Sequence, residues 1–228
     1  MKKIALCISG QPRFVEQGYE EVLKPYVLDG NKVDVFIHSW IPDEEQIGKP
    51  FINAGGHPMG KGVEKDIFDT IFKLYKPTRT FYEKQRFFEF GKYAERTLPY
   101  IRSDYLFSMF YSIWRSNNIL NDYVIETGIN YDWVIRSRFD VKLNNKVDFS
   151  LDNSSIFIPN GCWSDEGYVD CFAYSSKQNM DLYCNLYNNI DFIMHSSPIG
   201  FCGEFLLKYY LDTMKADVKE LFWHSLYR

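Results

Sequence analysis

The residues best suited to do chemistry follow an apolar run in the second half of the chain. The run begins at Trp133 and leads into Arg136, Arg138 and Asp140. If it forms a strand that stays extended as far as Val141, the period of two places the three charged side chains on one side. Two nearby positive charges favour the ionised form of Asp140, which then suits a metal ion or a sugar hydroxyl. A local ion pair that only ends the strand is the alternative interpretation.

The amino-terminal part of the chain predicts the framework for such a site. Residues 3–8 form a continuous apolar run that ends in a serine and a glycine, as expected for a strand buried on both faces. Residues 15–23 predict a helix stopped by Pro25, and residues 32–38 predict a second strand. Two strands joined by a helix form a parallel unit, and parallel sheets bind ligands at the carboxyl ends of their strands.

The rest of the chain alternates between helical and extended patterns. The predicted elements are a loop at 48–62, a helix at 66–76, a strand at 78–82, a helix from 103 to Gly128, strands at 155–159 and 168–174, a helix at 177–187, a loop at 190–203 and a helix at 204–214. Residues 83–102 show no clear period. Because no internal repeat or linker divides the sequence, we expect residues 1–228 to form a single α/β domain with a mostly parallel central sheet flanked by helices.

The predicted helix that begins at Ser103, its expected N-cap, has two stripes of side chains. One stripe is apolar and predicts the face that packs against the sheet. The other consists of Tyr111, Arg115, Asn118 and Asp122 at helical spacing. This second stripe is either solvated surface or a face on which Tyr111 and Arg115 contact a ligand.

Charge and composition argue against several classes of function. The net charge of -4 comes from short, mixed runs of charge, which do not form the clustered positive field that binds nucleic acid. The five cysteines are widely spaced without a C-x-x-C pair, which indicates neither a disulfide framework nor a zinc ribbon. The sequence has no apolar segment near the ~20 residues of a membrane span and no recognisable export signal. We therefore expect a cytoplasmic protein without a transmembrane segment.

Several of these motifs occur together in a known family. The strand that ends in Ser9-Gly10-Gln11-Pro12-Arg13, the long aromatic helix and the strand that runs into Arg-x-Arg-x-Asp resemble small nucleotide-sugar glycosyltransferases of the GT-A fold, found in large DNA viruses and bacterial surface-glycan clusters. The resemblance covers most of the chain, from Lys3 to about Tyr210. It implies a GT-A-like glycosyltransferase that moves a hexose or deoxyhexose from a UDP- or GDP-linked donor to a hydroxyl of a glycan acceptor.

The resemblance also assigns residues to the donor site. In the GT-A fold the loop after the first strand holds the nucleotide, and the corresponding residues here are Ser9, Gly10, Gln11 and Arg13. An Asp-x-Asp motif at the end of a central strand binds a divalent metal, Mn or Mg, on the donor diphosphate. The matching segment is Arg138-Phe139-Asp140. Because its first acidic position is an arginine, Asp140 alone is left as the expected metal ligand, and the need for a metal is open.

Arginines offer a second way to stabilise the leaving group. Breaking the bond between the sugar and the diphosphate releases negative charge onto the phosphate. A metal ion stabilises that charge as a Lewis acid, and guanidinium groups stabilise it through paired donors. The candidates for this role are Arg13, Arg115, Arg136 and Arg138.

Two carboxylates are candidates for the general base. An inverting transfer needs a base, usually Asp or Glu, on the acceptor hydroxyl, and the family that the chain resembles places an acidic residue near the donor sugar at about residues 164–172. Asp170 is therefore the first candidate. Glu204, in the first turn of a predicted helix, is the second, although an acid there also interacts favourably with the helix dipole. A retaining transfer needs neither.

Histidine and aromatic side chains near predicted strand ends offer further contacts. The ring of His38 either meets the base or ribose of the donor or caps the second strand. His195 and His224 lie where related folds supply a metal ligand, and they equally suit surface or core positions. Trp40, Trp163 and Tyr168 either bind sugar or pack in their loops.

Two other functions are compatible with the sequence. One is a non-catalytic nucleotide-sugar or glycan-binding module that has lost its second acidic position. The other is a sugar nucleotidyltransferase, a class that carries a glycine-rich loop and a lysine motif after the first strand. This chain has a single glycine in that loop, so the second alternative is the weaker one.

Overall fold

The central sheet is built around the first predicted strand. The computed structural model describes residues 2–50, 62–89, 92–97, 101–221 and 224–226. β1 (Lys3–Gly10) pairs in parallel with β2 (Lys32–Ile41) on one side and with β4 (Trp133–Ser137) on the other. The six residues from Ile4 to Ser9 are buried, as expected for a strand covered on both faces.

Seven strands complete this sheet in the order β3-β2-β1-β4-β7-β6-β8. The remaining strands are β3 (Arg79–Lys84), β6 (Ile156–Pro159), β7 (Phe172–Ser175) and β8 (Val218–Leu221). β7 runs antiparallel to both neighbours, and the other pairs are parallel. A second, two-stranded sheet pairs β5 (Val141–Leu143) with β9 (His224–Leu226). The expected α/β class with a mostly parallel central sheet is confirmed.

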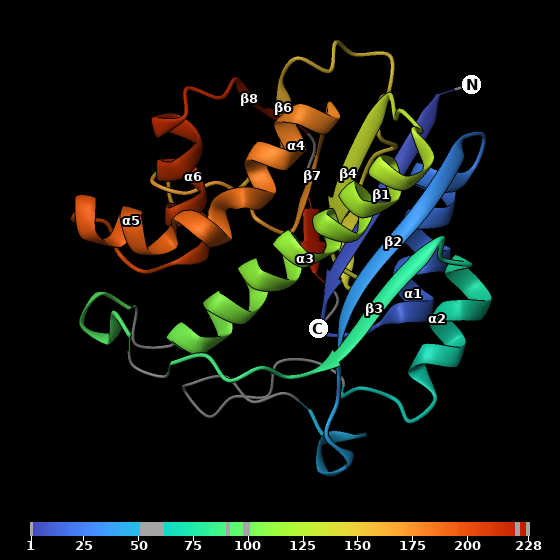
Figure 1. Ribbon diagram of the computed structural model, residues 1–228, viewed down its shortest axis with the longest axis horizontal. Coiled ribbons are helices and arrows are strands. Elements are labelled where there is room, and N and C mark those ends of the chain that lie inside the picture. Colours follow the sequence, from blue (N-terminus) through green and yellow to red (C-terminus); the bar gives the residue numbers. More distant parts are fainter. Residues whose placement is uncertain (1, 51–61, 90–91, 98–100, 222–223, 227–228) are drawn as a thin grey trace.

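Helices cover both faces of the sheet (Figure 1). One apolar core joins β1 to α1 (Val15–Gly18), the π-helix η1 (Tyr19–Leu28) and α2 (Ile67–Tyr75). The opposite core holds α3 (Ser103–Thr127), α4 (Lys177–Cys184), η4 (Asn185–Asn189), α5 (Ile190–Ser196) and α6 (Gly203–Thr213). Two short 3-10 helices, η2 (Glu44–Gln46) and η3 (Ala94–Arg96), lie in connecting segments. In the described residues, no helix is both long enough and apolar enough to span a membrane.

α3 follows its predicted pattern closely. Its apolar stripe, including Phe110, Ile113 and Leu120, packs in the core between the helix and the sheet. Gly128 ends the helix with a φ of 67°, a left-handed conformation that glycine adopts without strain. The cap at the other end is one residue earlier than predicted: Arg102 is the N-cap, and Ser103 is the first helical residue.

Several predicted elements differ from the observed ones. The first helix does not stop at Pro25 but continues to Leu28, because the wider π-helical turns accommodate a proline that has no N–H to donate. Part of the predicted loop at 190–203 is the helix α5. Residues 168–171, predicted as strand, precede a shorter β7. Most of the predicted loop at 48–62 lies outside the described residues.

Candidate functional site

The path of the chain creates a switch point beside β1. From β1 the chain moves outward to β2 and β3, and α3 then returns it to β4 on the other side of β1. The carboxyl ends of β1 and β4 are therefore neighbours at the place where the strand order reverses. In open α/β sheets, ligands bind at such a point. The residues considered below as the switch-point cluster are Arg13, Arg136, Arg138, Asp140 and Asp170.

Arg138 and Asp140 form a close ion pair just beyond β4. The strand ends at Ser137, and the next three residues form a turn. Arg138 donates from Nε to Asp140 Oδ1 at 2.7 Å and from Nη2 to Oδ2 at 2.8 Å. This is the local pair that the sequence offered as its alternative interpretation, and the predicted extension of the strand as far as Val141 is wrong, because the turn lets the two side chains meet.

A second guanidinium group reaches the same carboxylate. Arg13 Nη2 lies 3.4 Å from Asp140 Oδ2. Burial lowers the pKa of Arg13, and the charge of Arg138 adds to that effect while Asp140 opposes it. Burial also opposes the charge on Arg138, but the attraction of Asp140 outweighs it, so the pKa of Arg138 is raised. Two guanidinium groups thus lie against one carboxylate at this turn.

A glycine sets how closely the amino-terminal helix approaches this turn. A Cβ atom on Gly18 of α1 would lie 1.9 Å from the carbonyl oxygen of Phe139. The absence of a side chain therefore lets α1 pack directly on the backbone between Arg138 and Asp140. This contact fixes α1, and with it the segment that carries Arg13, against the turn after β4.

Arg136 faces the α3 side of the sheet and is 1% exposed. Its neighbours in register are Cys7 of β1 and Ala173 of β7, both in the core beneath α3. Its Nε and Nη1 atoms have no hydrogen-bond partner within the described chain, and the same holds for the buried hydroxyls of Ser9 and Tyr183. Ser9 follows Cys7 by two residues on the same face of β1. Unsatisfied polar groups therefore collect beneath α3 at the switch point, although buried polar groups are normally paired.

Asp170 lies at the edge of the sheet where β4 ends. It comes just before β7, which runs antiparallel to β4 and pairs Phe172 with Ser137. Burial and the nearby charge of Glu204 raise the pKa of Asp170 to about 6, against the opposing effect of Arg136 and Arg138. A Cβ atom on Gly203 would come within 2.7 Å of Asp170 Oδ2. The first turn of α6 thus approaches the carboxylate directly, and Asp170 is held where its protonation changes near neutral pH.

Glu204, the second candidate base, is engaged within the protein. Its Oε2 accepts a hydrogen bond from the thiol of Cys202 at 2.9 Å, and its Oε1 accepts one from the indole of Trp163 at 3.3 Å. The side chain lies in the first turn of α6. Its negative charge contributes to the raised pKa of Asp170.

The end of β1 is tied to α3 through a buried histidine. Gly10 has a φ of 110°, and its N–H donates to Ser112 Oγ at 2.9 Å. Ser112 Oγ lies 2.7 Å from His38 Nδ1, and His38 Nε2 lies 3.1 Å from Glu83 Oε1. Because the carboxylate only accepts, Nε2 carries the proton and Nδ1 accepts from the serine hydroxyl. Burial lowers the pKa of His38 to about 4, so the ring is neutral.

The predicted contact of His38 with a base or ribose would require this hydrogen-bond network to open. The ring is fully buried and has protein partners at both nitrogens. In this arrangement the histidine joins β2 to α3. Tyr111 donates its hydroxyl to the same Glu83 carboxylate at 2.8 Å, and the guanidinium of Arg115 lies 4.4 Å from the centre of the Phe81 ring. Both helix residues therefore contact the β3 side of the site and not Asp140.

The described residues do not provide a preformed metal centre. They include no group of three or more His, Cys, Asp or Glu side chains arranged to hold an ion. Both oxygens of Asp140 accept from guanidinium groups, a donor set that fits a divalent cation poorly. His195 is exposed, and its Nδ1 lies 2.6 Å from the carbonyl of Asp191 in its own helix. The side chain of His224 lies outside the described residues.

The aromatic candidates divide between surface and core. Trp163 is 58% exposed and packs on Phe205 at the start of α6, with ring centroids 5.2 Å apart. Trp40 is buried and lies against Tyr111. Tyr168 is half-buried beneath the ammonium of Lys208. Trp163, beside Glu204, is thus the aromatic side chain of the three that reaches solvent near the first turn of α6.

Sequence reasoning did not find Tyr183, Ser112, Glu83 or Gly203. Each reaches the site from an element distant in sequence, and each occupies an ordinary position in its own helix or strand. A weak signal existed for Ser112, a hydroxyl on the apolar face of a long predicted helix. Comparisons with known proteins add no assignment: no family model matches the chain, and no curated protein matches it.

Proposed function

We propose that this protein is a glycosyltransferase that moves a sugar from a nucleotide diphosphate donor to a hydroxyl of a glycan acceptor. The observation that carries the proposal is the position of the Asp170 carboxylate, beside Arg136 and Arg138 at the switch point of the sheet and against the first turn of α6, where burial and Glu204 raise its pKa to about 6. A base with a pKa near the working pH is well suited to accept the proton of an attacking hydroxyl.

The arginines supply the complementary part of this reaction. As the acceptor oxygen bonds to the sugar, the bond from the sugar to the diphosphate breaks and negative charge develops on the leaving phosphate. The side chain of Arg138 is 23% exposed and so reaches solvent. Arg13 and Arg138 lie against the same carboxylate, and their guanidinium groups are the donors proposed to stabilise this anion. The UDP- or GDP-linked donor predicted from the sequence resemblance would be held there, next to the end of β1.

Asp170 is preferred to Glu204 as the base for a geometric reason. Both oxygens of Glu204 accept hydrogen bonds from neighbouring side chains, whereas Asp170 has no side-chain hydrogen-bond partner in the described chain. Glu204 then has an indirect role, since its charge helps to keep the pKa of Asp170 high. No step of this proposal passes through a metal ion, and Mn or Mg dependence stays a separate prediction.

The test measures transfer and donor binding separately. Purified protein is incubated with UDP-, GDP- and TDP-sugars and a panel of oligosaccharide acceptors, with Mn or with EDTA, and nucleotide release is followed. Asp170→Asn is expected to lower transfer by roughly 10²- to 10⁴-fold, the usual contribution of a general base. Its donor-induced rise in melting temperature should persist, because the arginines are intact.

A second variant and three possible outcomes separate the alternatives. Asp140→Asn loosens the guanidinium groups and is expected to reduce both transfer and donor binding. Full transfer activity in Asp170→Asn would refute the role of this carboxylate as base. Calorimetric binding of a nucleotide sugar without turnover of any donor in the panel would favour the non-catalytic module, and release of pyrophosphate from a nucleoside triphosphate would favour the nucleotidyltransferase.

A further inference from the structure

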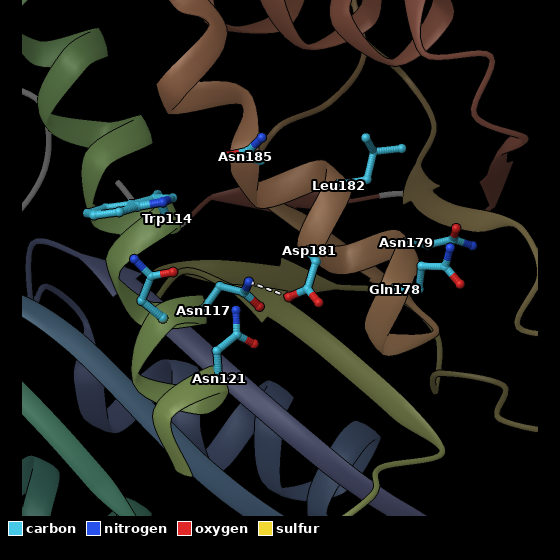
Figure 2. A pocket seen from close by; sticks show the side chains of 9 residues that line it. Trp114, Asn117, Asn121, Gln178, Asn179, Asp181, Leu182 and Asn185 are labelled. Atoms are coloured by element: carbon cyan, nitrogen blue, oxygen red, sulfur yellow. Dashed lines mark hydrogen bonds between the residues drawn. The ribbon is translucent and has the colours of Figure 1, made fainter. Parts of the chain in front are cut away.

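A cavity lies between α3 and α4, and no residue of the switch-point cluster lines it. It has a volume of about 570 Å³. Its lining residues are Trp114, Asn117, Asn118, Asn121, Gln178, Asn179, Asp181, Leu182 and Asn185. The lining is thus one indole, one aliphatic side chain, one carboxylate and six amides, and Figure 2 shows Asn117 of α3 and Asp181 of α4 turned toward each other.

The sequence explains why this space is open. On α3 the lining residues lie at positions 114, 117, 118 and 121, and on α4 and the following turn at 178, 179, 181, 182 and 185. Apart from Asn179, each set has the spacing of one helix face. Two facing helices normally fill such stripes with leucine or similar side chains. Here short amides occupy most of the positions, so the helices meet without closing the gap.

Several of the amides have unused hydrogen-bonding groups. Asn117 is 3% exposed; its Nδ2 donates to Asp181 Oδ1 at 2.7 Å, but its Oδ1 is buried without a partner in the described chain. The Oδ1 atom of Asn121 is also buried without a partner in the described chain. Buried amide oxygens are normally paired. Because protein atoms close off both oxygens, a molecule in the cavity meets instead the more accessible amides of Asn118, Gln178 and Asn185.

The charges at the cavity exclude a strongly anionic ligand. No lysine or arginine belongs to the lining formed by the described residues, and the lining carboxylate of Asp181 is already paired with Lys177 Nζ at 2.5 Å. Amides both donate and accept, as required for paired hydroxyl groups. The ring of Trp114, which contacts Tyr187 at 5.6 Å between centroids, adds an apolar surface at one end of the cavity (Figure 2).

From these observations we infer that the cleft between α3 and α4 is a binding site for an uncharged saccharide, separate from the switch-point cluster. Hydroxyls of the sugar contact the accessible lining amides of Asn118, Gln178 and Asn185, and its apolar C–H face lies against Trp114. The inference does not depend on the proposed transferase activity, because it concerns binding alone and residues outside the switch-point cluster.

Ligand-observed NMR and calorimetry test this site with maltotriose, cellotriose, chitotriose and lactose. At least one of these saccharides is expected to receive saturation from the protein. Asn121→Leu places a larger apolar side chain on the wall of the cavity, so it should abolish that binding while the melting temperature stays the same or rises. Asn118→Ala, a milder change, should weaken binding about three- to tenfold, the effect of one neutral hydrogen bond.

Asn145→Leu is the matched control, since Asn145 is exposed and remote from the cavity lining; its binding should equal that of the parent. If no saccharide of the panel binds at millimolar concentration, the inference is overturned. It is equally overturned if Asn121→Leu and Asn118→Ala both fold and bind as the parent does. Loss of transferase activity in Asp170→Asn has no bearing on either outcome.

Discussion

Asp140 and Asp170 lie at the same edge of the sheet, yet their surroundings are opposite. Asp140 accepts hydrogen bonds from two guanidinium groups and is 4% exposed. Asp170 has a second carboxylate, Glu204, among its nearest charges and no side-chain hydrogen-bond partner in the described chain. The first carboxylate is a fixed structural anion. The second is kept in a state in which it exchanges a proton near neutral pH.

The difference shows how one set of arginines serves two purposes. Arg138 holds Asp140 by direct hydrogen bonds and acts on Asp170 through its charge alone. Pairs of titratable groups in contrasting environments are a common sign of divided roles in a site. Asp140 is therefore expected to act mainly on stability and Asp170 mainly on chemistry, and the following experiments separate the two.

The largest effect is expected from Asp140→Ala. Removing this carboxylate leaves the guanidinium groups of Arg13 and Arg138 close together without the anion that lies between them. Removing one partner of a buried ion pair lowers the free energy of unfolding by about 3–5 kcal/mol. Urea denaturation should show a correspondingly lower free energy of unfolding. The exposed Asp165→Ala serves as the control and should stay within about 0.5 kcal/mol of the parent. An equal stability of the two variants would contradict the role of Asp140 as a structural anion.

Asp170→Asn is expected to act in the opposite direction. The native pKa of Asp170 is raised to about 6 from the usual 3.8, so the native state binds the proton more tightly than the unfolded chain does. The stabilising contribution is complete below pH 4 and is lost as pH rises to about 6. Asparagine carries no such dependence, so the variant should equal the parent at pH 3.5 and be about 3 kcal/mol more stable at pH 8.

Comparing variant and parent at each pH cancels the contribution of His38. Its lowered pKa of about 4 gives stability that is present above pH 6.5 and lost as pH falls through 4 in both proteins. The free energies of unfolding from urea titrations at pH 3.5, 5, 6.5 and 8 give the comparison. Parallel curves for the two proteins would show that Asp170 titrates normally, and the contrast with Asp140 would then fail.

Gly18→Ala tests whether the close packing of α1 on the backbone at Phe139 supports the turn that carries Asp140. The added Cβ atom would lie 1.9 Å from a main-chain oxygen, which cannot move as a side chain does, so α1 or the turn must shift. Overpacking of this kind costs about 1–3 kcal/mol. Thermal unfolding should show the loss, and Gly30→Ala is a useful contrast because the strain at its φ of 81° is local and its Cβ atom would have no neighbour within 4 Å.

The parts predicted from sequence are those in which apolar spacing determines the structure. The runs at 3–8 and 32–38 formed buried parallel strands, and the pattern after Ser103 formed a long helix that ends at Gly128. Hydrophobic burial along a single element suffices for such predictions. The turn after Ser137 escaped prediction because a bidentate ion pair, and not apolar spacing, ends the strand there.

The site was predicted less completely because its properties arise between elements. Asp170 was chosen through a family resemblance, but its raised pKa depends on Glu204 of α6 and on burial that the sequence does not reveal. The neutral state of His38 likewise depends on its burial, and its ring accepts a hydrogen bond from Ser112, which is 74 residues away along the chain. Hydrophobic periodicity and secondary-structure propensity carry no information on contacts between residues so far apart in the sequence. The candidate residues could therefore be identified from the sequence, whereas their protonation could not.

The smallest effect on stability, and the most informative one on chemistry, is expected from Gly203→Ala. The new Cβ atom would lie 2.7 Å from Asp170 Oδ2, and a carboxylate at the end of a side chain moves away at little cost, so stability should change by less than about 1 kcal/mol. Displacing the carboxylate alters its burial and its distances to Glu204 and Arg136, which set its pKa. The midpoint at which Asp170 titrates, followed by NMR of the carboxyl carbon, should therefore move away from about 6. An unchanged midpoint together with unchanged transfer would mean that α6 does not tune this carboxylate, and the difference between Asp140 and Asp170 would have to come from β4 alone.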